Sequence, residues 1–160
     1  MEASRPYMPG YGVSESAEGL LPWSWAEEKL VSSRNYWVAT VHPGGRPHVM
    51  PVWGVWHEGA MWFSSGLRSR KVRNLRTEPR CTVTIEDAMD PVVLDGVAAV
   101  VTGPAAIERF LGLLNAKYGT SYPIGFLDPE VNATIAVRPA RVFGLLQRDF
   151  GASPTRWTGF

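Results

Sequence analysis

Hydrophobic and polar residues alternate over much of this chain, and that period of two predicts strands rather than helices. The first clear strand is residues 35–42, NYWVATVH, which a turn at 43–45 joins to the aromatic run 46–56, RPHVMPVWGVW. The further strands are expected over residues 60–65, 81–87, 92–103 and 132–147. The last of these is either a strand pair or one strand broken at Pro139. Gly96 predicts a bulge or bend in the strand that contains it.

Three segments have helical signals instead. The capping-box pattern Ser24–Glu27 predicts a helix over 25–33, with Trp25, Leu30 and Val31 closing one end of a barrel. A second helix is expected to begin after Ser69 and to stop at Glu78-Pro79. A third begins at Pro104 and ends at Gly119, and its apolar stripe consists of Ile107, Phe110, Leu111, Leu114 and Tyr118. Many strands with few helices predict a mainly β protein, a closed antiparallel barrel with flanking helices.

The chain divides into an N-terminal arm over 1–22, a barrel domain over 23–147 and a C-terminal tail over 148–160. The prolines and glycines of the arm exclude a regular helix. The arm is therefore either disordered or pinned across a surface by Tyr7 and Tyr11, and its aromatic residues favour pinning, onto this chain or a partner subunit. The tail is short and marked by proline, so no ordinary strand is expected in it.

Composition limits the function classes. A chain of 160 residues is expected to form one domain, and its net charge of +1 gives no general affinity for nucleic acid. No apolar run reaches the length of a membrane span, and the polar, proline-rich start does not resemble a signal peptide. The single Cys81 excludes an internal disulfide and fits a reducing cytoplasm. We therefore expect a cytoplasmic protein that binds neither membrane nor nucleic acid.

The clearest candidate chemistry follows the strand 60–65. Its segment GLRSRKVRN contains four cations, Arg68, Arg70, Lys71 and Arg73. Ser69 can cap the helix that starts here, and the free amides of that first turn favour an anion. The hydroxyls of Ser64 and Ser65 add neutral donors. This basic turn predicts a phosphate site, and a solvated basic helix turn is the alternative.

The motifs RPHVMPVW, WFSSG and RSRKVRNL, in this order, resemble the pyridoxamine 5′-phosphate oxidase-like split β-barrels. More narrowly they are similar to actinobacterial members that use the deazaflavin coenzyme F420, over residues 25–142. The resemblance implies a homodimer with two cofactor sites at the subunit interface and places Met50, Pro51 and Val52 along the cofactor ring. We also expect Trp157, in the C-terminal tail, to contact the ring pocket of the cofactor across the dimer. The alternative is that Trp157 only covers the surface of the barrel. The expected cofactor-binding residues are His48, Val49, Met50, Pro51, Val52, Trp53, Ser64, Ser65, Arg68, Ser69, Arg70, Lys71, Asn74 and Trp157.

The function expected from this resemblance is hydride transfer from reduced F420 to a small conjugated organic substrate. The alternative is an FMN-binding flavoprotein, either an oxidase-like enzyme or a flavin carrier. The four cations favour F420, because that cofactor carries a phosphodiester and an anionic tail beyond it. Oxidation of pyridoxamine phosphate fits least, since the C-terminal stretch offers only Arg148 and Arg156 for a second phosphate.

Other reaction chemistries have little support in the sequence. Hydride transfer needs no protein nucleophile, so no catalytic side chain is assigned. The three histidines lack the spacing of metal ligands, and no metal site is expected. The tail contains no histidine to act as a haem ligand. Trp56 and Trp62 are expected in the core or in a subunit interface.

Overall fold

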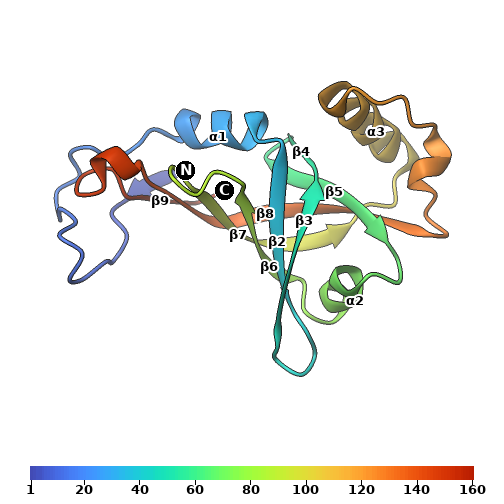
Figure 1. Cartoon of the computed structure of the whole chain (residues 1–160), viewed down its shortest axis with the longest axis horizontal. Coiled ribbons are helices and arrows are strands. Elements are labelled where there is room, and N and C mark those ends of the chain that lie inside the picture. The colour runs from blue at the N-terminus through green and yellow to red at the C-terminus, as the bar shows by residue number, and fades with distance from the viewer.

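The computed structural model describes all 160 residues, which form one antiparallel sheet of nine strands with three α-helices (Figure 1). The strands are β1 Glu2–Ser4, β2 Asn35–Val41, β3 Pro47–Trp53, β4 Val55–His57, β5 Ala60–Gly66, β6 Arg80–Ile85, β7 Val92–Val100, β8 Asn132–Gly144 and β9 Thr155–Thr158. The helices are α1 Trp23–Ser32, α2 Arg70–Thr77 and α3 Pro104–Tyr118, with short 3₁₀ turns η1 Ile124–Leu127 and η2 Gln147–Asp149. The predicted mainly β architecture is confirmed.

The sheet curves on itself but leaves one seam open. Strands β3, β2, β6, β7 and β8 follow one another as hydrogen-bonded neighbours, and the first half of β8 pairs with β5. Strand β3 lies beside β5, yet the two share no hydrogen-bonded ladder. The chain crosses this seam through Gly54 and β4, which pairs with β5. One edge of β3 is therefore unpaired where it faces β5.

Two hydrophobic cores lie on either side of the curved sheet. On β2, Tyr36, Val38 and Thr40 are buried while the alternate residues Trp37 and Val41 remain partly exposed, as a strand with one covered face requires. The inward residues of β2, β6, β7 and β8 build the larger core together with α1 and α2. Helix α3 covers a second core, and all five residues of its predicted stripe are buried there.

Two glycines allow the strands to bend. A Cβ on Gly54 would lie 2.0 Å from the Met61 side chain and 2.8 Å from the Trp62 carbonyl oxygen, so only glycine fits where β3 gives way to β4. The predicted irregularity at Gly96 is confirmed, because the register of β7 against β8 shifts between Asp95 and Gly96. Strand β8 passes through Pro139 without a break, which settles the open choice in favour of one strand.

The helix signals were right about α2 and α3 and partly wrong about α1. Ser69 caps α2, and Gly119 ends α3 with a left-handed φ of 67°. Helix α1, however, begins at Trp23 after Pro22, without a side-chain cap, so the predicted capping box does not form. Leu30 is buried as expected, whereas Val31 faces outward and closes no barrel end.

The arm and the tail form strands, which the prediction for the tail did not expect. Strand β9 pairs with the end of β8 on one side and with β1 on the other. The Arg5 guanidinium donates hydrogen bonds to the backbone oxygens of Ala152 and Pro154 at 2.7 Å, and also binds backbone oxygens within the arm. Tyr7 and Tyr11 are mostly exposed. The arm is thus held to its own chain by Arg5, by backbone pairing and by Tyr11, whose ring centroid lies 6.4 Å from that of Phe150, whereas Tyr7 faces outward.

Figure 1 shows α1 and α3 along the upper side of the sheet and α2 below it, beside the β2–β3 hairpin, whose tip projects downward. Strands β1 and β9 extend the sheet at the end away from α2 and α3. None of the helices has the length and apolar character needed to cross a bilayer.

Replacing Trp157 with alanine should destabilise the fold strongly. The side chain is 1% exposed and packs against Trp23 and Trp25, with ring centroids 5.8 and 6.4 Å away. Because Trp→Ala changes in a core cost about 3–5 kcal/mol, urea unfolding should show a loss of that size. A loss below about 1 kcal/mol would contradict the burial of this residue.

Candidate functional site

The basic turn predicted from the sequence forms a connected set of donors. The Ser69 hydroxyl accepts a hydrogen bond from the Val72 amide at 3.4 Å, as an N-cap does. The Ser65 hydroxyl lies 3.1 Å from that of Ser69, and the Lys71 ammonium donates to Ser65 at 3.2 Å. Partial burial lowers the pKa of Lys71. An anion bound beside this ammonium would offset its desolvation.

This turn is rich in positive charge that nothing in the chain neutralises. The cations of this stretch, Arg68, Arg70, Lys71, Arg73 and Arg76, form no ion pair with any carboxylate of the chain. No acidic residue occupies the first turn of α2. The backbone N–H groups of Arg70 and Lys71 also lack an acceptor. Free amides at a helix start together with unpaired cations make an anion site.

A small cleft of about 160 Å³ opens beside this turn, in the seam between β3 and β5. It is lined by Pro51, Val52, Trp53, Ser64, Lys71, Leu114 and Phe126. The first five of these are among the residues predicted from the sequence, and the structure brings them together. Pro51 lies on β3, which is an edge strand of the sheet. Because proline has no backbone N–H, it cannot donate a hydrogen bond across the seam, and this edge of β3 stays unpaired. We call this the seam cleft.

The residue that packs behind Trp53 in the seam cleft was not predicted from the sequence. Trp53 is 42% exposed, and its indole stacks on Tyr118 with centroids 4.4 Å apart and planes 6° apart. The Tyr118 hydroxyl accepts a hydrogen bond from the Gly54 N–H at 2.8 Å. Its own proton can go to the Arg34 carbonyl oxygen at 2.5 Å or to the Gly54 carbonyl oxygen at 3.1 Å. Sequence analysis had read Tyr118 only as the last member of an apolar stripe. No signal in the sequence pairs it with Trp53.

Lys117 is a second residue that the sequence analysis missed. Its ammonium donates to the Tyr36 hydroxyl at 2.7 Å and to the Gly54 carbonyl at 3.0 Å. Burial lowers the pKa of Lys117 to about 8, although Glu86 raises it in part. Burial likewise raises the pKa of Tyr36. Lys117 and Tyr118 together fix the chain at the point where β3 meets β4.

Four predicted residues lie near the basic turn but outside the seam cleft. Asn74 is fully buried, and its amide donates to the Thr40 hydroxyl at 2.9 Å, so it joins α2 to β2. His48 stands opposite Thr40 in the β2–β3 ladder. Val49 and Met50 are exposed on β3. Their role in cofactor binding stays a prediction.

Trp157 lies in the larger core at the α1 end of the sheet and does not line the seam cleft. Its contacts are Trp23 and Trp25 of its own chain. Its indole N–H is buried without an acceptor. A contact to a cofactor across a dimer stays a prediction, and this placement gives it no support.

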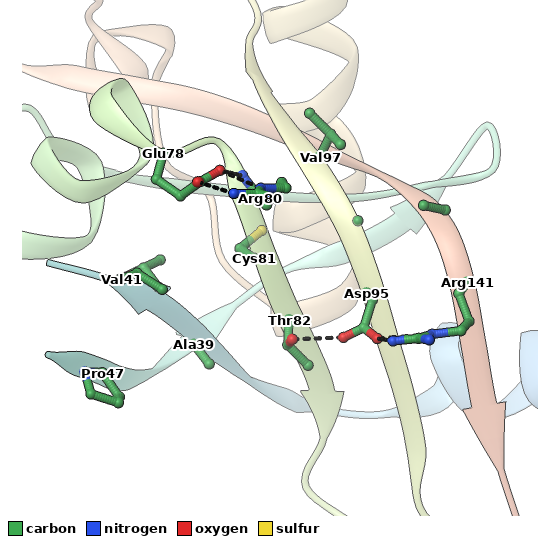
Figure 2. A pocket seen from close by; sticks show the side chains of 13 residues that line it. Ala39, Val41, Pro47, Glu78, Arg80, Cys81, Thr82, Asp95, Val97 and Arg141 are labelled. Atoms are coloured by element: carbon green, nitrogen blue, oxygen red, sulfur yellow. Dashed lines mark hydrogen bonds and ion pairs between the residues drawn. The ribbon is translucent and has the colours of Figure 1, made fainter. Parts of the chain in front are cut away.

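A larger cavity, of about 530 Å³, lies on the outer face of the sheet and contains none of the predicted residues (Figure 2). The charged side chains that line it are already paired with other side chains of the cavity. Asp95 accepts hydrogen bonds from Thr82 at 2.7 Å and from Arg141 at 2.6 Å, and Arg80 pairs with Glu78. Burial, with the nearby Asp95 charge, raises the pKa of the Cys81 thiol to about 12, so it is no nucleophile. Size alone therefore does not make this cavity the functional site.

The seam cleft can hold an anion beside a flat apolar surface. Lys71 is the cation that lines it, beside the free amides of α2, while Trp53 and Phe126 offer aromatic faces. No group of three or more His, Cys, Asp or Glu side chains is placed to hold a metal ion. The arrangement suits a phosphate-bearing molecule with a planar ring.

A sequence model of the family described as pyridoxamine 5′-phosphate oxidase matches residues 26–145. The match covers every strand from β2 to β8, α2 and the seam cleft. No curated protein matches the sequence significantly.

Three solved structures are similar to this chain. Rv2991, a conserved hypothetical protein from Mycobacterium tuberculosis, is 23% identical with a TM-score of 0.74, over 87% of this chain and 93% of that one. A structure described as an F420 reductase is 25% identical with a TM-score of 0.57, over 72% and 94%. The haem storage protein HutZ from Vibrio cholerae is 19% identical with a TM-score of 0.61, over 72% and 88%. These likenesses support the split-barrel fold while their described functions differ.

The free energy of unfolding should depend on the Lys117 side chain in alkaline solution. Its pKa is about 8 in the folded chain and near 10.5 when unfolded, so the unfolded state binds more protons between these values. Lys117 therefore makes stability rise with pH from about 8 upward. Denaturant unfolding of the wild type and of Lys117→Met at several pH values between 8 and 10 gives the two free energies of unfolding. Their difference isolates the contribution of Lys117, because the other titrating groups contribute to both proteins. Parallel pH profiles would contradict the lowered pKa.

Proposed function

Because the chain belongs to the pyridoxamine 5′-phosphate oxidase family, we propose that it is an oxidoreductase that uses reduced coenzyme F420 to reduce a small conjugated organic molecule. The proposal is supported by the match of the family model across the seam cleft. It is also supported by the similarity to a structure described as an F420 reductase, at 25% identity. The haem storage relative lies at lower identity and supports the fold alone.

The observation that carries the proposal is the unneutralised charge of the basic turn. Arg68, Arg70 and Lys71 have no carboxylate partner, and two amides of α2 remain free. Guanidinium and ammonium groups bind phosphate oxygens with charge-assisted hydrogen bonds. Arg73 adds a further cation to α2, beyond Arg70. FMN, which ends at one phosphate, would leave Arg70 or Arg73 without a partner.

When bound, the reduced deazaflavin supplies the hydride, and the protein supplies position and a dry pocket. Lys71, Ser65 and Ser69 bind and orient the phosphate. Trp53, backed by Tyr118, forms a rigid wall for the ring, and Pro51 leaves the edge of β3 open toward it. Holding the substrate over the ring at reacting distance is the main contribution of these residues. No side chain of the seam cleft is assigned to proton transfer.

A homodimer is part of the proposal, because the seam cleft is too small to enclose a cofactor alone. Cofactor sites commonly measure about 300–1,000 Å³, whereas this one measures about 160 Å³ in one chain. The outer face of the sheet beside it exposes apolar residues of adjacent strands, among them Trp37, Val41 and Val49. Such a patch favours a protein interface. A second copy on this face would add walls to the site.

An FMN-binding flavoprotein remains the alternative, favoured by the family as a whole. The phosphate would then occupy the same basic turn. The two functions differ in what lies beyond that phosphate, and the arginines of α2 distinguish them.

Lys71→Ala should weaken binding of both F420 and FMN by about tenfold or more, because a hydrogen bond to a charged group contributes roughly 1.5–3 kcal/mol. The fold should be almost unchanged, since a partly exposed cation contributes little to stability. Fluorescence titration of wild type and variant with each cofactor measures the change. An unchanged affinity for both would remove the basic turn from the site.

Arg73→Ala should weaken the binding of F420 and leave that of FMN unaffected, because only F420 carries further anionic groups beyond the phosphate. The same titration serves, with Lys71→Ala as the reference for a contact common to both cofactors. Tighter binding of FMN than of F420 by the wild type would overturn the deazaflavin assignment and leave the flavoprotein alternative.

Light scattering should report a dimer for the wild type at micromolar concentration. Val41→Glu should shift it toward monomer, because this residue is 42% exposed on the outer face of the sheet. Val31→Glu is the matched control, being 53% exposed on α1 away from that face. A monomeric wild type, or equal behaviour of the two variants, would contradict the proposed interface.

A further inference from the structure

A second cleft, of about 430 Å³, lies where the end of β7, the start of β8 and the last turn of α2 meet. We call it the lateral cleft. Its walls are mainly apolar and include Leu67, Ile107 and Leu127, which belong to or pack on the two separate cores. It shares no lining residue with the seam cleft. Its volume is that of an ordinary small-molecule site.

One buried polar group of the lateral cleft has no partner. Thr134 is 2% exposed, and its hydroxyl makes no hydrogen bond within the chain. Its backbone is satisfied, since the carbonyl accepts from the Val101 amide at 2.9 Å. Leaving a buried hydroxyl unpaired is costly. A ligand atom that reaches the inner wall of the cleft would remove that cost.

The rim of the lateral cleft is positive. Arg76, in the last turn of α2, lines it and has no carboxylate partner. Thr102 adds a hydroxyl just before α3, whose N-cap Gly103 provides no side-chain cap. No acidic residue lines the cleft. The nearby Asp128 carboxylate is bound to the Glu130 amide at 2.9 Å.

We propose that the lateral cleft binds a small monocarboxylate with a hydroxyl at its far end, with the carboxylate at Arg76 and Thr102, the apolar chain between Ile107 and Leu127, and the far hydroxyl at Thr134. A guanidinium pairs with carboxylate through directed hydrogen bonds, and the aliphatic walls bury a short chain. This site goes beyond the proposed reductase function and does not depend on it. The buried Thr134 hydroxyl is the deepest polar contact of the ligand.

The two clefts are neighbours through one strand pair. Thr134 on β8 stands directly opposite Ser64 on β5, and Ser64 lines the seam cleft. Side chains of such a pair lie on the same face about 5 Å apart. Phe126 and Leu127, consecutive in η1, line the seam cleft and the lateral cleft respectively. A ligand in the lateral cleft would therefore press on the wall of the seam cleft.

The test is a titration of the full chain, without cofactor, with 8-hydroxyoctanoate and with octane-1,8-diol, followed by backbone amide NMR shifts. The hydroxy acid should shift Val101, Thr102 and Thr134 and bind about tenfold more tightly than the diol, because only the anion pairs with Arg76. Arg76→Gln should reduce the affinity for the hydroxy acid to that for the diol. Arg138→Gln removes an exposed arginine without an ion pair outside the cleft and should leave the affinity unchanged.

Thr134→Val keeps the shape and removes the unpaired hydroxyl. It should raise the urea midpoint while weakening the binding of 8-hydroxyoctanoate several-fold, because the far hydroxyl of the ligand loses its partner. Equal affinities of the hydroxy acid and the diol for the wild type, no binding of the hydroxy acid at millimolar concentration, or an unchanged affinity for it in Arg76→Gln or Thr134→Val would overturn the proposal. Because F420 is absent, these results do not depend on whether the seam cleft binds it.

Discussion

The open edge of β3 is the constraint on which the rest of this structure depends. A strand that pairs with only one neighbour leaves a row of backbone groups unpaired, and soluble proteins cover or interrupt such edges. Here Pro51 offers no N–H to the seam, and β3 ends before Gly54, whose backbone groups bind the Tyr118 hydroxyl and the Lys117 ammonium instead. The seam between β3 and β5 therefore stays open, and α2 begins beside it.

The position of α2 then decides what the seam can bind. Strand β5 ends at Gly66, and Ser69 caps the start of α2 three residues later. The free amides of α2 and the Lys71 ammonium therefore lie at the opening of the seam. The remaining arginines of α2 find no acid anywhere in the chain. A protein that only needed a stable helix here would gain from acidic residues in its first turn. The absence of acids is easier to understand as a binding requirement.

Sequence reasoning succeeded where the signal was local. The cap at Ser69, the left-handed Gly119 and the irregularity at Gly96 each depend on one residue type in one backbone setting. It failed where the partner lies far along the chain. The strand β9 exists because β8 and β1 offer it edges on both sides. Its four residues include three strand-favouring ones, but so short a segment directly after Pro154 does not predict a strand by itself.

The same limit applies to the site. Pro51, Val52 and Trp53 could be expected on one wall because they follow one another in β3. The stack of Trp53 on Tyr118, which is separated from it by the whole of β4 to α3, could not be expected. Nor could the lateral cleft, whose residues come from five elements and the loops between them and have no common motif.

The central claim is that the phosphate of the cofactor binds at the start of α2 and its ring in the seam between β3 and β5. Amide NMR of the labelled chain during addition of F420 tests it most directly. The account predicts large shifts at Ser69, Arg70 and Lys71 and at the indole N–H of Trp53. Shifts confined to the outer-face cavity around Thr82, Asp95 and Arg141, with none at α2, would contradict it.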